Sequence, residues 1–176
     1  TGITWTITNS GDNTNFTLRA TVITGAGTVV PSVAANLVQD PATNGNTAST
    51  SSDNSVTYDN STLGVTVEQL LVQADPTNAL PITFAVVFTK AINVSTFTTG
   101  DITQNGTATG ITWSITNSGN DKNFTLEATA VSTNGTVIPS IAANAVQDPA
   151  TNGNTASTSS DNSVTYDTVA PSATIT

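Results

Sequence analysis

Two loops of identical sequence, Asp-Pro-Ala-Thr-Asn-Gly-Asn, begin at Asp40 and at Asp148 and concentrate oxygen-bearing side chains. Such side chains suit hard cations, because Ca²⁺ takes six to eight oxygen ligands from carboxylates, amides and backbone carbonyls. Asp148, Asn152 and Asn154, together with Asp59 from the preceding linker, would supply about half of such a shell or more. The same letters also describe a turn, in which Asp accepts backbone N–H groups, Pro fixes φ and Gly adopts positive φ. Both interpretations are open at this point.

The loop occurs twice because the chain carries an internal repeat. Residues 1–59 recur as residues 109–167, and 46 of the 59 aligned positions are identical. The longest unbroken match joins residues 38–59 to residues 146–167. A fixed period of about 108 residues, the length of one domain, is typical of a tandem array. We therefore expect this sequence to act as a segment of an array.

The repeat also predicts how the chain is divided. Residues 1–59 would be the C-terminal half of one repeat, residues 60–168 a complete repeat, and residues 169–176 a linker and the first strand of the next repeat. The half-copy lacks the counterparts of residues 64–103, so we expect that it cannot close a core alone. The missing strands come either from an upstream continuation of the chain or from another chain. The sequence does not separate these alternatives.

Composition indicates an all-β protein that does not bind nucleic acid. Charged residues make up only 9% of the chain, and Thr, Asn, Ser, Ala and Val dominate it. Abundant β-branched residues with few Lys and Glu favour strands over helices. The formal net charge is −9, with Arg19, Lys90 and Lys122 as the cations, so a phosphate backbone would be repelled. No apolar run reaches the roughly 18 residues of a membrane-spanning helix, so no membrane insertion is expected of this segment.

Apolar side chains at every second position predict seven strands in the complete repeat. The strands are expected around residues 65–67, 82–88, 97–102, 111–115, 124–128, 137–141 and 164–166. Seven short antiparallel strands in about 108 residues are typical of an immunoglobulin-like two-sheet sandwich. Pro139 falls inside the sixth strand, where it cannot donate a ladder hydrogen bond, so we expect a bulge or one-sided pairing there.

Strand direction predicts where the acidic loops meet. Successive strands run in opposite directions, so the loop that begins at Asp148 should lie at the end where the linker carrying Asp59 enters. By the same argument the loop that carries Asp75 should lie beside Asp167, where the chain leaves the repeat. Each junction would then collect carboxylate and amide oxygens for Ca²⁺, the expected cofactor. The candidate metal ligands are Asp40, Asp59, Asp75, Asp148, Asn152, Asn154 and Asp167.

Several motifs of the repeat resemble those of bacterial immunoglobulin-like tandem repeats, which build the stalks of large surface adhesins and biofilm-associated proteins. The motifs are Val-Thr-Val-Glu-Gln at 65–69, Gln-Ala-Asp-Pro-Thr-Asn at 73–78, Phe-Thr-Thr-Gly-Asp at 97–101, Gly-Thr-Val-Ile at 135–138 and Asp-Pro-Ala-Thr-Asn-Gly-Asn-Thr-Ala-Ser at 148–157. The resemblance implies a location outside a bacterial cell, on its surface, and junctions stiffened by calcium. The chain departs from the pattern at Lys90, where an acidic residue followed by proline is expected, so this loop lacks one metal-facing carboxylate.

Enzyme chemistry is not expected. The chain has no His and no Cys, which removes the usual base and the thiol nucleophile. The acidic residues fall in turns of a repeated unit, whereas a carboxylate pair in a glycosidase faces a single cleft.

Two classes of function follow from the sequence. The first is a structural extender or filament segment, whose partners are neighbouring repeats of the same chain and other copies of the same protein. A variant of this class is a subunit that polymerises by strand complementation. The second class is an adhesive module that binds a glycan or a protein through its loop tips. Near-identity of the two copies favours the extender, because specific binding rarely needs the same surface many times.

Overall fold

The computed structural model describes residues 2–175, and it divides into two units, residues 1–61 and residues 62–176. All regular elements of the described residues are strands, apart from two short 3₁₀ turns. The predicted all-β class is therefore confirmed. No helix in residues 2–175 has the length and the apolar character needed to cross a bilayer.

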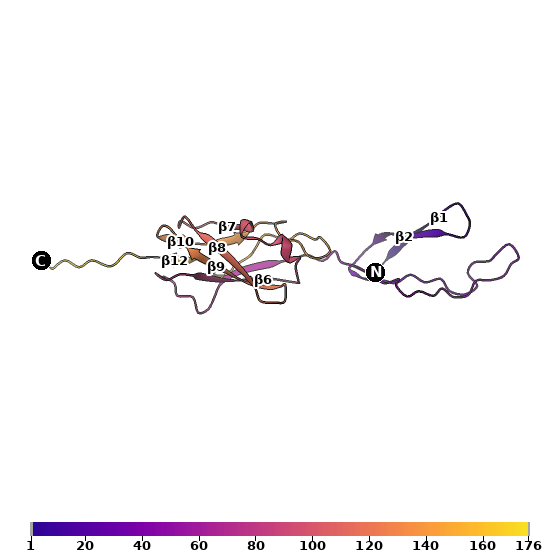
Figure 1. The fold of residues 1–176 in the computed structure, drawn as a ribbon, viewed down its shortest axis with the longest axis horizontal. Helices are drawn as coiled ribbons and strands as arrows, with labels where there is room; N and C mark the ends of the chain where they lie inside the picture. The colour runs from indigo at the N-terminus through magenta and orange to yellow at the C-terminus, as the bar shows by residue number, and fades with distance from the viewer. Residues whose placement is uncertain (1, 176) are drawn as a thin grey trace. The chain divides into compact units, whose positions relative to one another are not determined.

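A four-stranded antiparallel sheet forms one layer of the 62–176 unit (Figure 1). Its strands are β5 (Val65–Gln69), β6 (Ile82–Phe88), β9 (Asn123–Ala130) and β8 (Thr112–Asn117), in that order across the sheet. The alternation predicted for β6 is present, because Ile82, Phe84, Val86 and Phe88 are fully buried while the residues between them are not. One face of this sheet thus makes half of the core.

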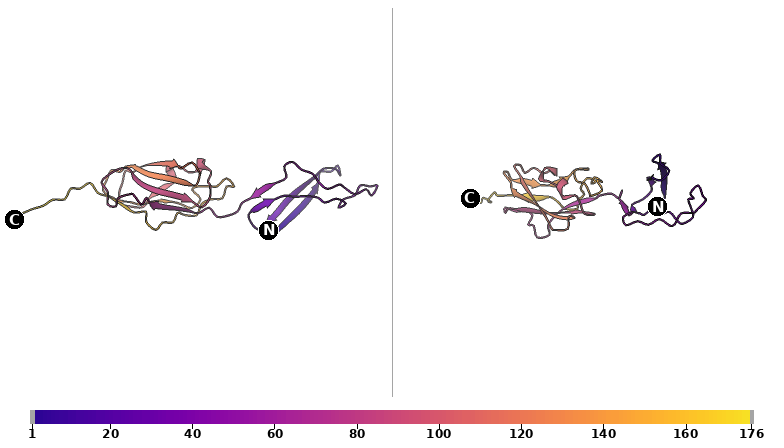
Figure 2. Two further views of the ribbon diagram at one scale, coloured as in Figure 1. Left: turned by 90° about the horizontal axis from the view of Figure 1, so that it is seen from below. Right: turned by 45° about the vertical axis from the view of Figure 1, so that its right-hand side comes forward.

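Two strand pairs form the opposite layer of this unit (Figure 2). β7 (Ile102–Gln104) pairs with β11 (Pro139–Ile141), and β10 (Gly135–Val137) pairs with β12 (Val164–Tyr166). Val137, Ile141 and Val164 from these pairs join the residues of β6 in one buried cluster. The core therefore lies between the two layers.

The predicted sixth strand is divided into β10 and β11. The break falls between Val137 and Pro139, and the two halves pair with different strands, β12 and β7. A proline that cannot donate to a ladder is tolerated at the first residue of a strand, which is where Pro139 stands. The expectation of one-sided pairing at this position is confirmed.

Two sequence predictions differ from the structure. Phe97 was expected in a third strand, but it follows the 3₁₀ turn η1 (Val94–Thr96), precedes η2 (Thr99–Asp101), and reaches the core by ring contacts. Its ring centroid lies 5.4 Å from that of Phe88 and 5.2 Å from that of Phe124. The first strand of a next repeat, expected within residues 169–176, is not observed, since residues 167–175 are in no strand; Thr176 lies outside the described residues.

The 1–61 unit has the strands of a half-copy. β1 (Ile3–Asn9) pairs with β2 (Phe16–Ile23), and β3 (Gly27–Val29) pairs with β4 (Val56–Tyr58). β3 and β4 match β10 and β12 after a displacement of 108 residues, and β1 and β8 both carry a register shift just before their Trp. No counterpart of β11 forms at residues 31–33, because residues 2–61 contain no counterpart of its partner β7.

Candidate functional site

The Asp148 loop of the 62–176 unit is folded as a tight turn. The Asp148 side chain is only 1% exposed. Its Oδ1 accepts a hydrogen bond from the Asn152 backbone N–H at 2.8 Å, and its Oδ2 accepts one from the Asn152 side-chain Nδ2 at 2.9 Å. The Asp148 carbonyl accepts the Thr151 N–H at 2.9 Å. The carboxylate therefore satisfies backbone and amide donors inside its own loop, as the turn interpretation predicts.

Lys90, two residues after β6, supplies the positive charge at this loop. Its Nζ lies 2.5 Å from Asp148 Oδ2, and its side chain is 24% exposed. Burial raises the pKa of Asp148, but hydrogen bonding from Lys90 and from Asn152 outweighs it and holds this pKa below its usual value. An ammonium group thus lies against the Asp148 carboxylate, which the sequence suggested as a calcium ligand.

Asn154 is also committed to structural hydrogen bonds. Its side chain is 2% exposed. Oδ1 accepts the Val146 N–H at 2.7 Å, and Nδ2 donates to the carbonyls of Ala142 at 2.9 Å and Thr155 at 2.7 Å. This amide joins the two sides of the loop. Its oxygen already serves a buried backbone donor, which would lose its partner if the oxygen turned to a cation.

The ion pair at Asp148 and the hydrogen bonds of Asn154 occupy oxygen atoms that a calcium ion in this loop would bind. A cation would have to displace Lys90 from Asp148 and the Val146 N–H from Asn154. The loop therefore does not fit a calcium ion while these contacts hold, and calcium binding here stays a prediction that a titration decides.

Asp40, the counterpart of Asp148 in the 1–61 unit, has the same turn geometry. Oδ1 accepts the backbone N–H groups of Ala42 and Asn44, each at 2.9 Å, and Oδ2 accepts Asn44 Nδ2 at 3.0 Å. The hydrogen bond from the Asn44 side chain is the main cause that lowers the pKa of Asp40. Thr43 and Thr151 share positive φ angles of 66° and 67°. The turn is therefore a local property of the repeated sequence.

Asp75 and Asp167 lie together at the other end of the 62–176 unit. Thr77 forms a parallel bridge with Tyr166, and the Asp167 N–H donates to the Thr77 carbonyl at 2.9 Å. Asp75 Oδ1 accepts the Thr165 N–H at 2.8 Å. The two loops are thus side by side, as strand direction predicted.

The carboxylates at the linkers also hold their own backbone. Asp167 Oδ1 accepts the Val169 N–H at 2.8 Å and Asn134 Nδ2 at 3.0 Å. Asp59, in the 1–61 unit, is half-buried, and its Oδ1 accepts the Ser61 N–H at 2.8 Å. Among residues 2–175 no three acidic side chains gather closely enough to share one ion.

Glu68 is a carboxylate that holds backbone and hydroxyl groups distant in sequence, a role that its place in the predicted first strand did not reveal. It accepts the backbone N–H groups of Ser160 at 2.9 Å and Asp161 at 2.8 Å, and the hydroxyl of Ser159 at 3.1 Å. Burial raises the pKa of Glu68, but the hydrogen bonds from Asp161 and Ser160 outweigh it and lower that pKa. Its partners lie more than 90 positions away, so only the fold reveals this role.

Comparison of the chain with family models, curated proteins and solved structures finds no match. The repeat, the fold and the contacts of the carboxylates are therefore the observations from which a function can be proposed.

Proposed function

We propose that this chain is a structural extender or filament segment of a bacterial cell-surface protein, built from tandem immunoglobulin-like seven-strand sandwiches of about 108 residues. The observation that carries the proposal is the structural repeat. Strands β3 and β4 recur as β10 and β12, with the same pairing and a displacement of 108 residues. A chain that repeats one stable unit gains length with each copy, and length is the property that an extender needs.

The path of the chain through the 62–176 unit supports head-to-tail extension. Leu63, two residues before β5, forms a parallel bridge with Asn154, and Thr77, beyond the end of β5, forms one with Tyr166. The segment from 154 to 166 therefore runs alongside residues 63–77 in the same direction. The chain therefore enters the unit at one end and leaves it at the other, which is the path that a head-to-tail array needs.

Apolar packing and one ion pair hold the two layers of the unit together. The buried cluster draws residues from both layers, and the Lys90–Asp148 ion pair joins the segment after β6 to the loop after β11. The two carboxylates at the other end, Asp75 and Asp167, are exposed and are where calcium remains part of the proposal. Two carboxylates supply only part of the six to eight oxygens that Ca²⁺ takes, so extension is proposed independently of calcium.

Calorimetric titration of the full chain with Ca²⁺ separates these components. Binding with millimolar affinity that is lost in Asp75→Asn and Asp167→Asn, but kept in Asp148→Asn, would place the ion at the exit end. Calcium binding that is lost in Asp148→Asn would contradict the conclusion that the Lys90 ammonium group is the cation beside Asp148. If no heat is released, calcium leaves the proposal and the extender remains.

The extender itself is tested by solution scattering. Chains lengthened by one and by three further copies of the 108-residue repeat are compared with the 176-residue chain. We expect the maximum dimension to grow by a constant roughly 30–40 Å per repeat, the length of a sandwich with strands of about ten residues. A maximum dimension that does not grow with copy number would contradict an extending role.

An adhesive role is a second candidate because one loop tip is apolar. Leu71 and Val72, in the turn after β5, are 105% and 90% exposed. Neighbouring apolar side chains at a loop tip can serve a protein contact. Replacing both with Ser should abolish adhesion of lengthened chains to a host surface if this role holds, and should leave the scattering dimensions unchanged.

A further inference from the structure

The inner face of the 1–61 unit is apolar and uncovered. Phe16, Leu18 and Val56 are 57%, 43% and 65% exposed. Their counterparts after a displacement of 108 residues are Phe124, Leu126 and Val164, which are at most 3% exposed. The residue types are identical at these positions, so the difference in exposure comes from the neighbours. In the 62–176 unit those neighbours include β5 and β6, which have no counterpart in residues 2–61.

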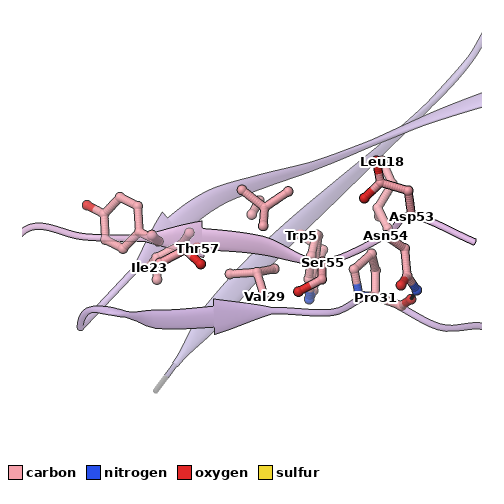
Figure 3. Close-up of a pocket in the computed structure, with 12 residues that line it drawn as sticks. Trp5, Leu18, Ile23, Val29, Pro31, Asp53, Asn54, Ser55 and Thr57 are labelled. Atoms are coloured by element: carbon pink, nitrogen blue, oxygen red, sulfur yellow. Dashed lines mark hydrogen bonds between the residues drawn. The ribbon is translucent and has the colours of Figure 1, made fainter. Parts of the chain in front are cut away.

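A groove marks where these neighbours are missing (Figure 3). It has a volume of about 480 Å³ and lies between the β1–β2 hairpin and the β3–β4 pair. Trp5, Leu18, Ile23, Val29 and Pro31 are among the side chains that line it. The lining is mostly apolar, which suits the burial of another apolar strand face.

We propose that this groove binds an antiparallel strand pair of the sequence type of β5 and β6, with the β6-like strand hydrogen-bonded along β2. The 62–176 unit supplies the template, because β9, the counterpart of β2, pairs with β6 on one side and β8 on the other. β2 pairs only with β1 within residues 2–61, so its other edge is open. An open edge of unpaired N–H and C=O groups is a site for strand addition.

The repeat fixes the register of the incoming strand. In the 62–176 unit Ile82, Phe84 and Val86 stand opposite Ala128, Leu126 and Phe124. Displacement by 108 residues sets the expected pairs: Ala20 with the Ile82 counterpart, Leu18 with the Phe84 counterpart, and Phe16 with the Val86 counterpart. A slip of one residue would turn the apolar face of the incoming strand to solvent, so this register is strongly preferred.

Aromatic contacts give the site its selectivity for bulky residues. Phe84 packs edge-on against Trp113 at a centroid separation of 6.3 Å, and Phe88 packs against Phe124 at 5.8 Å. Trp5 and Phe16 are the counterparts of Trp113 and Phe124. The incoming strand therefore needs an aromatic residue at each of two positions four apart, as β6 has.

A longer ligand should also order a new strand. Residues 139–141 form β11 because β7 pairs with them, whereas Pro31, Ser32 and Val33 form no strand. Val33 is nevertheless held as Ile141 is, since each accepts a backbone hydrogen bond from a Ser sixteen residues later. A ligand that includes a β7 counterpart, as the sequence of residues 60–108 does, should convert residues 31–33 into a strand.

This inference rests on the proposed function in one respect, because the strand pair is taken to come from another repeat of the array. The test joins a second copy of residues 60–108 to the N-terminus of the 176-residue chain. Trp113→Phe makes Trp5 the sole tryptophan, because residues 60–108 contain none. We expect the Trp5 emission to shift to the blue, and the amides of residues 16–23 to exchange at least about 100-fold more slowly than in the unextended chain.

A matched control replaces the counterparts of Phe84 and Val86 with Asp in the added copy alone. This control should leave Trp5 and β2 as exposed as in the unextended chain. The proposal is overturned if Trp5 stays exposed in the extended chain while residues 62–176 remain folded. It is also overturned if the unextended chain buries Trp5 in a dimer, because a second half-copy would then be the occupant. The scattering experiment on the extender adds repeats after residue 176, whereas this experiment adds residues before Thr1. Failure of the extender proposal can therefore be distinguished from failure of the groove proposal.

Discussion

The ion pair between Lys90 and Asp148 provides the sharpest test of how the carboxylate loop is used. Lys90→Met keeps an unbranched aliphatic chain of similar reach and removes the ammonium group 2.5 Å from Asp148 Oδ2. The Asp148 carboxylate, 1% exposed, is then left without its counter-charge. If a structural ion pair holds this loop, the change must destabilise the 62–176 unit.

The magnitude follows from burial. Breaking a buried ion pair by removing one partner costs about 3–5 kcal/mol, because the remaining charge stays desolvated. Lys90 is 24% exposed and Asp148 keeps its hydrogen bonds from Asn152, so the cost should be smaller. We expect a loss of about 2–3 kcal/mol in the free energy of unfolding, or about 8–15 °C in Tm.

The assay is urea unfolding followed by Trp113 fluorescence in a Trp5→Phe background. Lys122→Met is the matched control, since the described residues give Lys122 no ion pair, and it should change the free energy of unfolding by less than about 0.5 kcal/mol. In an Asp148→Asn background, Lys90→Met should cost less than half as much. An equal cost for both lysine variants, or an undiminished cost without the carboxylate, would refute the reasoning.

Three further predictions concern pH, packing and exposure. Hydrogen bonds hold the pKa of Glu68 below its ordinary value. The stability that the Glu68 carboxylate contributes is therefore present above about pH 4.3 and is lost as the pH falls through the folded-state pKa. The urea midpoint of the chain should fall on acidification, and it should fall less steeply in Glu68→Gln. A Cβ at Gly106 would lie 2.0 Å from the Thr136 carbonyl oxygen, whereas a Cβ at Gly100 would lie 3.5 Å from the Thr98 hydroxyl. Gly106→Ala should therefore cost about 1–3 kcal/mol in urea unfolding, and an equal effect of Gly100→Ala would contradict this. Val164→Ala should cost about 2 kcal/mol and Val56→Ala less than about 0.5 kcal/mol, because the side chains are 0% and 65% exposed. Urea unfolding is followed at Trp113 for the first variant and at Trp5, in a Trp113→Phe background, for the second. The difference should shrink once the added strand pair covers the 1–61 unit.

Much of the fold could be predicted because the alternation of apolar residues is strong. The pattern over residues 82–88 placed β6 within its observed bounds, and Pro139 marked the division of the sixth strand. Phe97 was misplaced because a single buried aromatic carries no periodicity. Its neighbours form 3₁₀ turns, stabilised by side-chain bonds such as Thr98 N–H to Asp101 Oδ2 at 2.7 Å.

The candidate site was less predictable because its chemistry depends on partners distant in sequence. The loop from Asp148 to Asn154 is compatible with a turn or with a cation site when it is considered alone. Lys90 lies 58 positions away, and only pairing of the strands brings its ammonium group to Asp148. The departure at Lys90 from the pattern of the bacterial repeats that the sequence resembles was visible in the sequence, but its consequence required the fold.

Single-molecule stretching of a lengthened chain tests the central claim, that each complete repeat is an independent closed unit that carries load from one end to the other. Unfolding 108 residues from a domain of roughly 30–40 Å should release roughly 320–350 Å of contour length. We predict one force peak of this spacing for each complete repeat, in EDTA as well as in buffer. Smooth extension without peaks, or peaks whose spacing and number do not follow the repeats, would contradict the account.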